Sequence, residues 1–229
     1  MIIFFKCKNT ICDLKLFLIR ILNFFLIAIY FTSFGQEIKE VQLSQSIDDS
    51  TFVRLNDFSN EFVYDLRYAT ENNFLKAKVY DCAECFLRYK TVKKLIEAND
   101  KFKKKGYTIK LLDCYRPLDV QKRMWAIVPN PIYVADPKKG SIHNRGGAVD
   151  ITLVDKNGVE LDMGTAFDHF GKEAAHTYEN FSEEVLKNRK ILREVMESCS
   201  FKVFQSEWWH YNLVTDENDK VSNFKWDCH

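Results

Sequence analysis

Two short segments, far apart in the chain, carry side chains that could together hold a metal ion. They read Ser-Ile-His-Asn-Arg-Gly-Gly-Ala-Val-Asp at residues 141–150 and Glu-Trp-Trp-His at residues 207–210. The imidazoles of His143 and His210 and the carboxylate of Asp150 are groups that zinc accepts, and three protein ligands leave a fourth position open for water. A further carboxylate, Glu207, lies three residues before the second histidine and could accept a proton. This combination is typical of catalytic zinc sites and indicates a hydrolase.

The first segment runs from a loop into a predicted strand. Residues 147–154 alternate in the manner of a strand, and Asp150 is a lone carboxylate within an apolar stretch. Burying such a carboxylate is costly unless a cation pairs with it. Gly146 and Gly147 allow the chain to turn sharply, so His143 and Asp150 could reach one ion.

The second segment poses a geometrical condition. Glu207 and His210 are three residues apart, which places them on opposite faces of a regular strand. Both can serve one site if Glu207 lies in a turn or bulge just before the strand begins. Taken singly, His143 could be a surface-loop residue and His210 a hydrogen-bonded core residue beside two tryptophans. Taken together with Asp150 and Glu207, they favour a metal site.

The remaining pattern predicts an α+β fold, a central antiparallel sheet flanked by helices that pack on one side. The expected elements are a strand at 62–68, a helix at 91–105, a strand at 107–114, a short helix after Pro117, a loop at 129–140, a strand at 147–154 with a hairpin turn at Asn157-Gly158, a helix that begins after Ser182, and strands near 201–205 and 209–214. We expect one zinc peptidase domain at 61–229, preceded by a tether or edge segment at 36–60.

Residues 1–35 have the pattern of a secretory signal. Basic residues precede an apolar run at 21–34 that is short for a membrane span, and small residues follow it. The alternative is an uncleaved membrane anchor. Cleavage changes the formal net charge from +1 to −2, because it removes four basic residues and Asp13. We expect an exported protein, periplasmic or extracellular, with no nucleic-acid partner and no stable membrane insertion after cleavage.

Five cysteines follow the expected signal segment. In an exported protein they predict one or two disulfides with one thiol left over, and the pairing is open. The Cys-x-x-Cys pair also permits a zinc or redox interpretation, although no second ligand pair stands at a familiar spacing. The five are Cys82, Cys85, Cys114, Cys199 and Cys228.

The motifs as a set resemble the zinc D-Ala-D-Ala dipeptidase family (VanX type), which is related to D,D-carboxypeptidases. The resemblance is carried by Ser-x-His-x-x-Gly-x-Ala-x-Asp and Glu-x-Trp-His. Three further stretches support it: Asp-Leu-Arg-Tyr-Ala-Thr at 65–70 with Asn73-Phe74, Asp-Cys-Tyr-Arg-Pro at 113–117, and Met-Gly-x-x-Phe-Asp at 163–168. Together these stretches span roughly residues 62–213.

The resemblance implies one zinc ion per chain with His143, Asp150 and His210 as ligands and Glu207 as general base. Arg116 would stabilise the charged tetrahedral intermediate. Asp113, three residues earlier, either orients the Arg116 guanidinium or is a surface residue in a turn.

Asp113 and four further residues are candidates for contact with a small dipeptide, whose two ends are charged. Ser141 could bind the carboxylate, and Asp168 either binds the ammonium group or caps a turn. Trp208 and Trp209 could wall a small pocket or pack in the core. The family usually has Ser at the position of Asn144 and often Gly at that of Lys76, differences that could reshape the pocket mouth.

The sequence therefore favours an exported zinc dipeptidase that cleaves D-Ala-D-Ala into two D-alanines during cell-wall peptide turnover. The closest alternative is a D,D- or L,D-carboxypeptidase that trims peptidoglycan stem peptides. A zinc-binding module without activity is a third possibility, and the presence of Glu207 argues against it.

Overall fold

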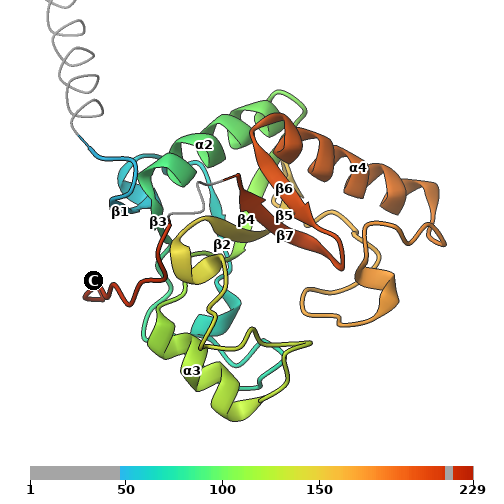
Figure 1. Ribbon diagram of the computed structural model, residues 1–229. Coiled ribbons are helices and arrows are strands. Elements are labelled where there is room, and N and C mark those ends of the chain that lie inside the picture. The colour runs from blue at the N-terminus through green and yellow to red at the C-terminus, as the bar shows by residue number, and fades with distance from the viewer. Residues whose placement is uncertain (1–46, 215–218, 229) are drawn as a thin grey trace, which may run out of the picture. The chain divides into compact units, whose positions relative to one another are not determined.

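A computed structural model describes residues 47–214 and 219–228 (Figure 1). The expected signal segment at 1–35, and residues 36–46 of the expected tether, lie outside this part of the chain. The described residues from Asp49 onward belong to one compact unit. None of the helices in this part of the chain is both long and apolar enough to cross a membrane.

A five-stranded sheet forms the centre of this unit, in the order β2-β4-β5-β7-β6 (Figure 1). Its strands are β2 (Val63–Tyr64), β4 (Tyr107–Asp113), β5 (Ala148–Asp155), β6 (Phe201–Phe204) and β7 (Glu207–Leu213). The β4–β5, β5–β7 and β6–β7 pairs are antiparallel, as expected. The edge strand β2 instead runs parallel to β4, so the prediction of a wholly antiparallel sheet is wrong there. The fold class, α+β, is confirmed.

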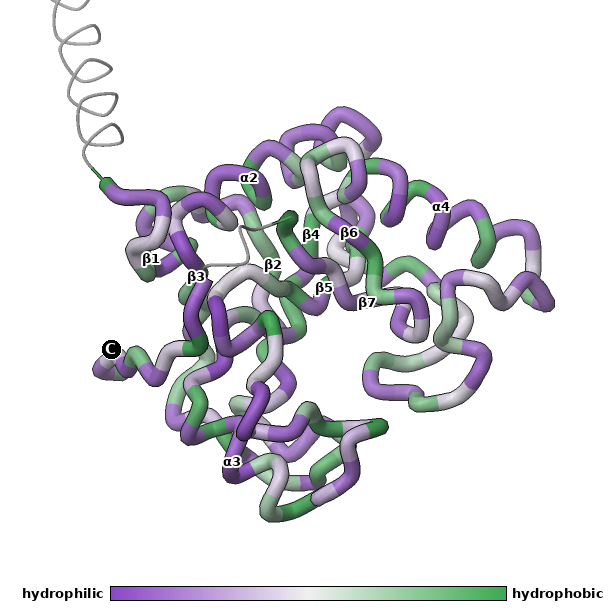
Figure 2. The backbone as a smooth tube through the Cα atoms, in the orientation of Figure 1, coloured by the Kyte–Doolittle hydropathy of each residue, from purple (hydrophilic) through white to green (hydrophobic). Residues whose placement is uncertain are grey.

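Two long helices lie on one side of the sheet, α2 (Tyr89–Lys103) and α4 (Glu183–Ser198) (Figure 1). Both are amphipathic, and hydrophilic and hydrophobic residues alternate along them in Figure 2. Their apolar faces, including Leu95 and Leu192, are fully buried in the same core as the sheet residues Ile109 and Ile151. The helices therefore cover the apolar face of the sheet, and the opposite face remains for polar side chains.

The ends of the helices follow from local chemistry. Ser182 caps α4, since its Oγ accepts a hydrogen bond from the Val185 amide. Pro117 precedes α3 (Leu118–Ile127), where the lack of an amide proton costs nothing. α3 belongs to a second, smaller apolar cluster that includes Val120 and Met124. Three-residue 3-10 helices occupy Arg67–Ala69, His143–Arg145 and Lys172–Ala174.

Residues 49–60, within the expected tether or edge segment, belong to the same compact unit as the central sheet. β1 (Phe52–Arg54) pairs antiparallel with β3 (Phe86–Arg88) in a separate two-stranded sheet. A 3-10 helix at Leu55–Asp57 follows β1, and Leu55 is completely buried in the main core. The structure thus places the start of the compact unit at residue 49, earlier than the expected 61.

Two disulfides link distant parts of the unit, Cys82–Cys228 and Cys85–Cys114. Cys199 is a free, buried thiol. This confirms the expectation of one or two bridges with one thiol left over. The two cysteines of the Cys-x-x-Cys pair enter different bridges, so in this structure they form neither a common zinc site nor a redox pair.

Candidate metal centre

The three predicted metal ligands meet at the centre of the sheet. Asp150 on β5 and His210 on β7 are direct cross-strand partners, and His143 lies in the 3-10 helix that precedes β5. Asp150 Oδ1 is 3.0 Å from His210 Nδ1 and 3.4 Å from His143 Nε2. The two imidazole nitrogens are 3.2 Å apart. One small ion could therefore contact all three side chains.

The second nitrogen of each imidazole is held by a hydrogen bond. His143 Nδ1 donates to the Cys114 carbonyl at 2.7 Å, and His210 Nε2 donates to Asn212 Oδ1 at 2.8 Å. The nitrogens that face each other, His143 Nε2 and His210 Nδ1, then carry lone pairs. Two lone pairs and a carboxylate directed at one point form a set of acceptors that a bound cation would satisfy. The donor set thus fits a metal ion, and two nitrogens with one oxygen suit zinc.

The electrostatics of the buried carboxylate agree with this arrangement. Burial alone would raise the pKa of Asp150, but His143 and His210 outweigh burial and hold that pKa well below its ordinary value. Burial would lower the pKa of His210, whereas the adjacent Asp150 carboxylate raises it. Asp150 therefore stays ionised at neutral pH and is available as a ligand.

Glu207 lies beside the ligands because β7 is irregular. Val203 and Phe204 are neighbours on β6, yet they pair with Tyr211 and Glu207, so the three residues of β7 between these positions have no partner on β6. This bulge brings Glu207 Oε2 to 3.9 Å from His210 Nδ1. The expected bulge is present, although Glu207 is the first residue of the strand rather than part of a preceding turn. Burial raises the pKa of Glu207, which brings it closer to the range useful for proton transfer.

Arg116 lies in a buried polar network just after β4. Its NH2 donates to Asp113 Oδ2 at 2.6 Å and its NH1 to Gln121 Oε1 at 2.9 Å. Asp113 also accepts a 2.7 Å hydrogen bond from the Tyr80 hydroxyl. Burial would lower the pKa of Arg116, and Asp113 keeps it raised. Asp113 is completely buried, so of its two predicted roles the geometry agrees with orientation of Arg116.

A cavity of about 280 Å³ opens over these side chains. Ser141, Asp168 and Trp209 line it, together with the three ligand residues, Glu207 and Arg116. Trp208 does not line this cavity, because its indole nitrogen donates to Thr165 Oγ1 at 2.8 Å within the core. The structure therefore brings Trp209, but not Trp208, to the predicted pocket.

Asp168 faces the cavity in a setting that is unusual for a carboxylate. Its Oδ1 accepts a 3.0 Å hydrogen bond from the Tyr68 hydroxyl, and its Oδ2 accepts one from the Phe74 amide at 3.5 Å. Burial, followed by the nearby charge of Asp150, raises the pKa of Asp168 to about 8. A cationic group in the cavity would stabilise the ionised form of this side chain.

Three residues of the site were not singled out from the sequence. Tyr68 packs under the Arg116 guanidinium, 5.2 Å from it, and lies within the 65–70 stretch. Asn212 follows His210 by two residues, a spacing that places both on one face of a strand and that gave a usable signal. Gln121 gave no signal, since its contact with Arg116 depends on the direction in which α3 leaves Pro117.

Comparison with known proteins places these features in context. A family model for D-Ala-D-Ala dipeptidases (peptidase M15) matches residues 48–227. The chain is 35% identical over 150 residues to the D-alanyl-D-alanine dipeptidase of Escherichia coli K12, covering 65% of this chain and 77% of that protein. It is 30% identical over 183 residues to that of Enterococcus faecium, covering 71% and 91%. A solved zinc complex of the D,D-pentapeptidase VanY aligns with a TM-score of 0.37 and 15% identity, covering 59% of this chain and 76% of VanY.

Proposed function

This chain belongs to the D-Ala-D-Ala dipeptidase family of peptidases, and on that premise we propose that it hydrolyses free D-Ala-D-Ala into two D-alanines with one zinc ion per chain. The main support for the proposal is that one ligand atom each of His143, Asp150 and His210 meet at one point. Glu207 Oε2 lies 3.9 Å from His210 Nδ1. That arrangement holds a cation and a separate proton acceptor in one small cavity.

Zinc in such a site is a Lewis acid and lowers the pKa of a coordinated water to about 7. Glu207 would take the proton of the attacking water and return it to the departing amine. Arg116 would stabilise the negative charge that develops on the former carbonyl oxygen. Arg116 lines the cavity, so part of its guanidinium can face a substrate bound there.

The cavity suits a short substrate with a charge at each end. Its volume of about 280 Å³ is near the lower end of the range for ligand pockets, about 300–1,000 Å³. We assign Asp168 to the substrate ammonium group and Ser141 to the substrate carboxylate, since both line the cavity. Trp209 would form an apolar wall.

Hydrolysis of two substrates distinguishes the dipeptidase from a carboxypeptidase that trims stem peptides. Purified protein is incubated with free D-Ala-D-Ala or with a stem pentapeptide, and released D-alanine is measured. We expect release from the dipeptide. Release from the pentapeptide alone would replace the dipeptidase assignment with the carboxypeptidase.

The roles of metal and base are tested by a chelator and by Glu207→Gln. Chelation should abolish turnover, and added zinc should restore it. Glu207→Gln should retain one zinc per chain and lose about 100-fold or more in kcat, the usual range for a general base. Glu160→Gln changes an exposed carboxylate paired with Lys110 and should leave kcat unchanged. Full activity of Glu207→Gln would remove this residue from the mechanism.

We also propose that the protein is exported. The basic and apolar pattern of residues 1–35 supports this, as do the two disulfides, because disulfides persist in oxidising compartments. The N-terminal sequence of protein recovered from a cell-envelope fraction should begin after residue 35. A full-length chain in the cytoplasmic fraction would contradict export.

A further inference from the structure

The chain after β7 returns to the site as a C-terminal strap, defined here as residues 219–228. The Ser222 amide donates to the Asn144 carbonyl at 2.8 Å, and the Ser222 carbonyl accepts from the Leu118 amide at 3.1 Å. Asn144 follows the ligand His143, and Leu118 comes two residues after Arg116. One strap residue therefore bridges the two segments that present a metal ligand and the catalytic arginine.

Asn144 links the same two segments from inside. It is completely buried. Its Nδ2 donates to the Arg116 carbonyl at 2.7 Å, and its Oδ1 accepts from the Ser141 amide at 2.7 Å. The Arg116 amide in turn donates to the His143 carbonyl at 3.1 Å. The segments of Arg116 and His143 are thus joined by two hydrogen bonds, one between their backbones and one from the Asn144 side chain to the Arg116 carbonyl.

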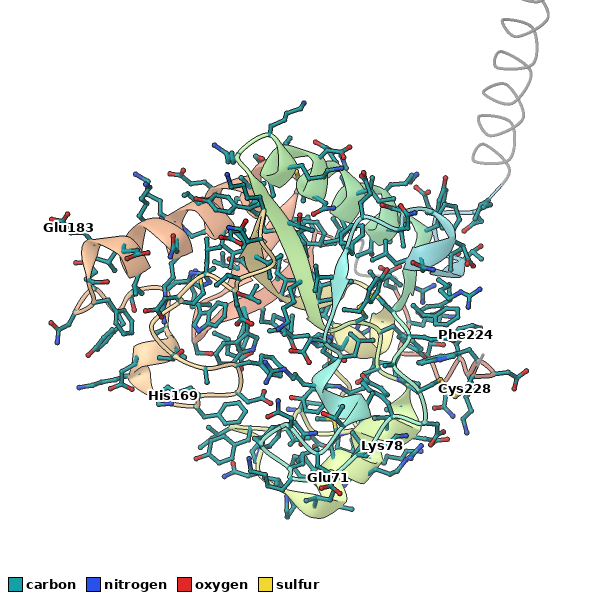
Figure 3. All side chains as sticks on the ribbon, turned by 180° about the vertical axis from the view of Figure 1, so that it is seen from behind. Glu71, Lys78, His169, Glu183, Phe224 and Cys228 are labelled. Atoms are coloured by element: carbon teal, nitrogen blue, oxygen red, sulfur yellow. A yellow bond between two sulfur atoms is a disulfide. The ribbon has the colours of Figure 1, made fainter. Side chains whose placement is uncertain are left out.

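The strap is fixed at both ends. Near its start, Asp219 forms an ion pair with Lys90 at 2.9 Å, and its carbonyl accepts a hydrogen bond from Arg145. Further along, the Phe224 ring stacks on Phe52 with 5.2 Å between the ring centroids. At its end, Cys228 is disulfide-bonded to Cys82 (Figure 3). Because the strap is anchored in this way, it can hold Asn144 against the Arg116 segment.

We propose that Asn144 is a positioning residue that, together with the C-terminal strap, sets the placement of Arg116 relative to His143. It would act on the peptide groups behind the site and touch neither substrate nor metal. Residues that orient metal ligands in this way typically change metal affinity or activity about 10- to 100-fold when removed. Both parts of this inference rest on the proposed zinc site, and only the activity part also rests on the proposed substrate.

The test compares Asn144→Ala with Asn99→Ala, since the chain contains a matched buried asparagine. Asn99 Nδ2 donates to the Glu61 carbonyl at 2.9 Å, and its Oδ1 accepts from the Ile109 amide at 2.9 Å, remote from the cavity. Asn144→Ala loses one donated hydrogen bond and two accepted ones, because Asn144 Oδ1 also accepts from the Ser141 hydroxyl at 3.2 Å. Asn99→Ala loses one donated and one accepted hydrogen bond, so both variants should melt at a lower temperature. Only Asn144→Ala should weaken zinc binding, measured by chelator competition, and lower kcat, each by about 10-fold or more with a smaller change in KM.

Two further variants cover the case in which Asn144→Ala does not fold. Asn144→Asp keeps the acceptor for the Ser141 amide and loses the donor to Arg116, so it should weaken zinc binding and kcat in the same direction. The paired change Cys82→Ser with Cys228→Ser frees the end of the strap and should also weaken zinc binding. Equal melting losses in Asn144→Ala and Asn99→Ala, with wild-type zinc affinity and kcat in both, would overturn the inference. So would wild-type zinc affinity in both further variants.

Failure of the proposed function gives a different result from failure of this inference. If the wild-type protein binds zinc but does not hydrolyse D-Ala-D-Ala, the proposed substrate is wrong. The comparison of zinc affinity between Asn144→Ala and Asn99→Ala still decides the positioning role.

Discussion

Replacement of Asp113 by Asn should damage both stability and turnover, although Asp113 does not line the cavity. Its carboxylate is completely buried and contacts three groups: it is 2.6 Å from Arg116 NH2, 2.7 Å from the Tyr80 hydroxyl and 3.6 Å from His143 Nδ1. The amide keeps the shape and one acceptor for Tyr80. It removes the negative charge that faces the buried Arg116 guanidinium.

The size of the effect follows from the loss of a buried counterion. Removing one partner of a buried ion pair typically costs about 3–5 kcal/mol, and the retained acceptor favours the lower value, about 3 kcal/mol. In a domain of this size about 1 kcal/mol lowers the melting temperature by roughly 2–4 °C, so we expect a decrease of roughly 6–12 °C. Arg116 remains present but less well oriented, and kcat should fall about 10- to 100-fold.

Thermal melting of the zinc-loaded protein and steady-state kinetics with D-Ala-D-Ala measure both quantities. Asp65→Asn is the control, because Asp65 pairs with Arg67 and Lys110 at 2.9 Å and 2.8 Å near the surface. That change should cost about 1 kcal/mol or less and leave kcat unaltered. If Asp113→Asn melts and turns over like Asp65→Asn, Asp113 does not hold Arg116 in a productive orientation.

Two further predictions concern backbone strain and pH. Lys76 is exposed and has a φ of 51°, a left-handed backbone conformation that favours glycine. Lys76→Gly should therefore raise the free energy of unfolding by about 0.5 kcal/mol. The control Lys78→Gly, at an exposed position without positive φ, should lower it. The pKa of Asp168 is raised to about 8 in the folded protein, against about 3.9 in the unfolded chain. Between these two pH values the folded protein keeps a proton that the unfolded chain has released. The free energy of unfolding therefore falls as the pH rises from about 4 to about 8. Urea denaturation of the metal-free protein should give a lower free energy of unfolding at pH 8 than at pH 5, and the difference should be smaller in Asp168→Asn. Equal differences in the two proteins would show that Asp168 is not the source of this pH dependence.

The three candidate ligands could be singled out from the sequence because few side chains bind zinc and because a lone aspartate in an apolar strand is costly to bury without a cation. The register of β5 and β7, the two strands that carry Asp150 and His210, could not be predicted from the sequence. Asp150 lies opposite His210 through a pairing between strands that are about 60 residues apart in the chain, and local alternation does not specify such a partner. The sequence thus singled out the three side chains that converge, and the β5–β7 ladder brings Asp150 and His210 together.

The parallel edge strand had a signal that the antiparallel expectation overlooked. A strand followed by a helix and a second strand is the usual order for a parallel pair, and β2, α2 and β4 follow it. The signal was weak because β2 comprises only Val63–Tyr64 before the chain turns into a 3-10 helix at Arg67–Ala69. The expected strand at 62–68 was therefore too long, and Tyr68 reaches the site from a helix rather than from the sheet.

The bulge in β7 shows why even correct residue types leave the chemistry undetermined. Regular alternation would place Trp208 on the same side as His210 and Trp209 on the other. The irregular pairing with β6 instead leaves Trp208 in the core and brings Trp209 and Glu207 to the cavity. The position of the proton acceptor Glu207 beside the candidate ligands thus depends on three residues of β7 that have no partner on β6. A change that restored regular pairing there would therefore be expected to move Glu207 away while His210 kept its place opposite Asp150.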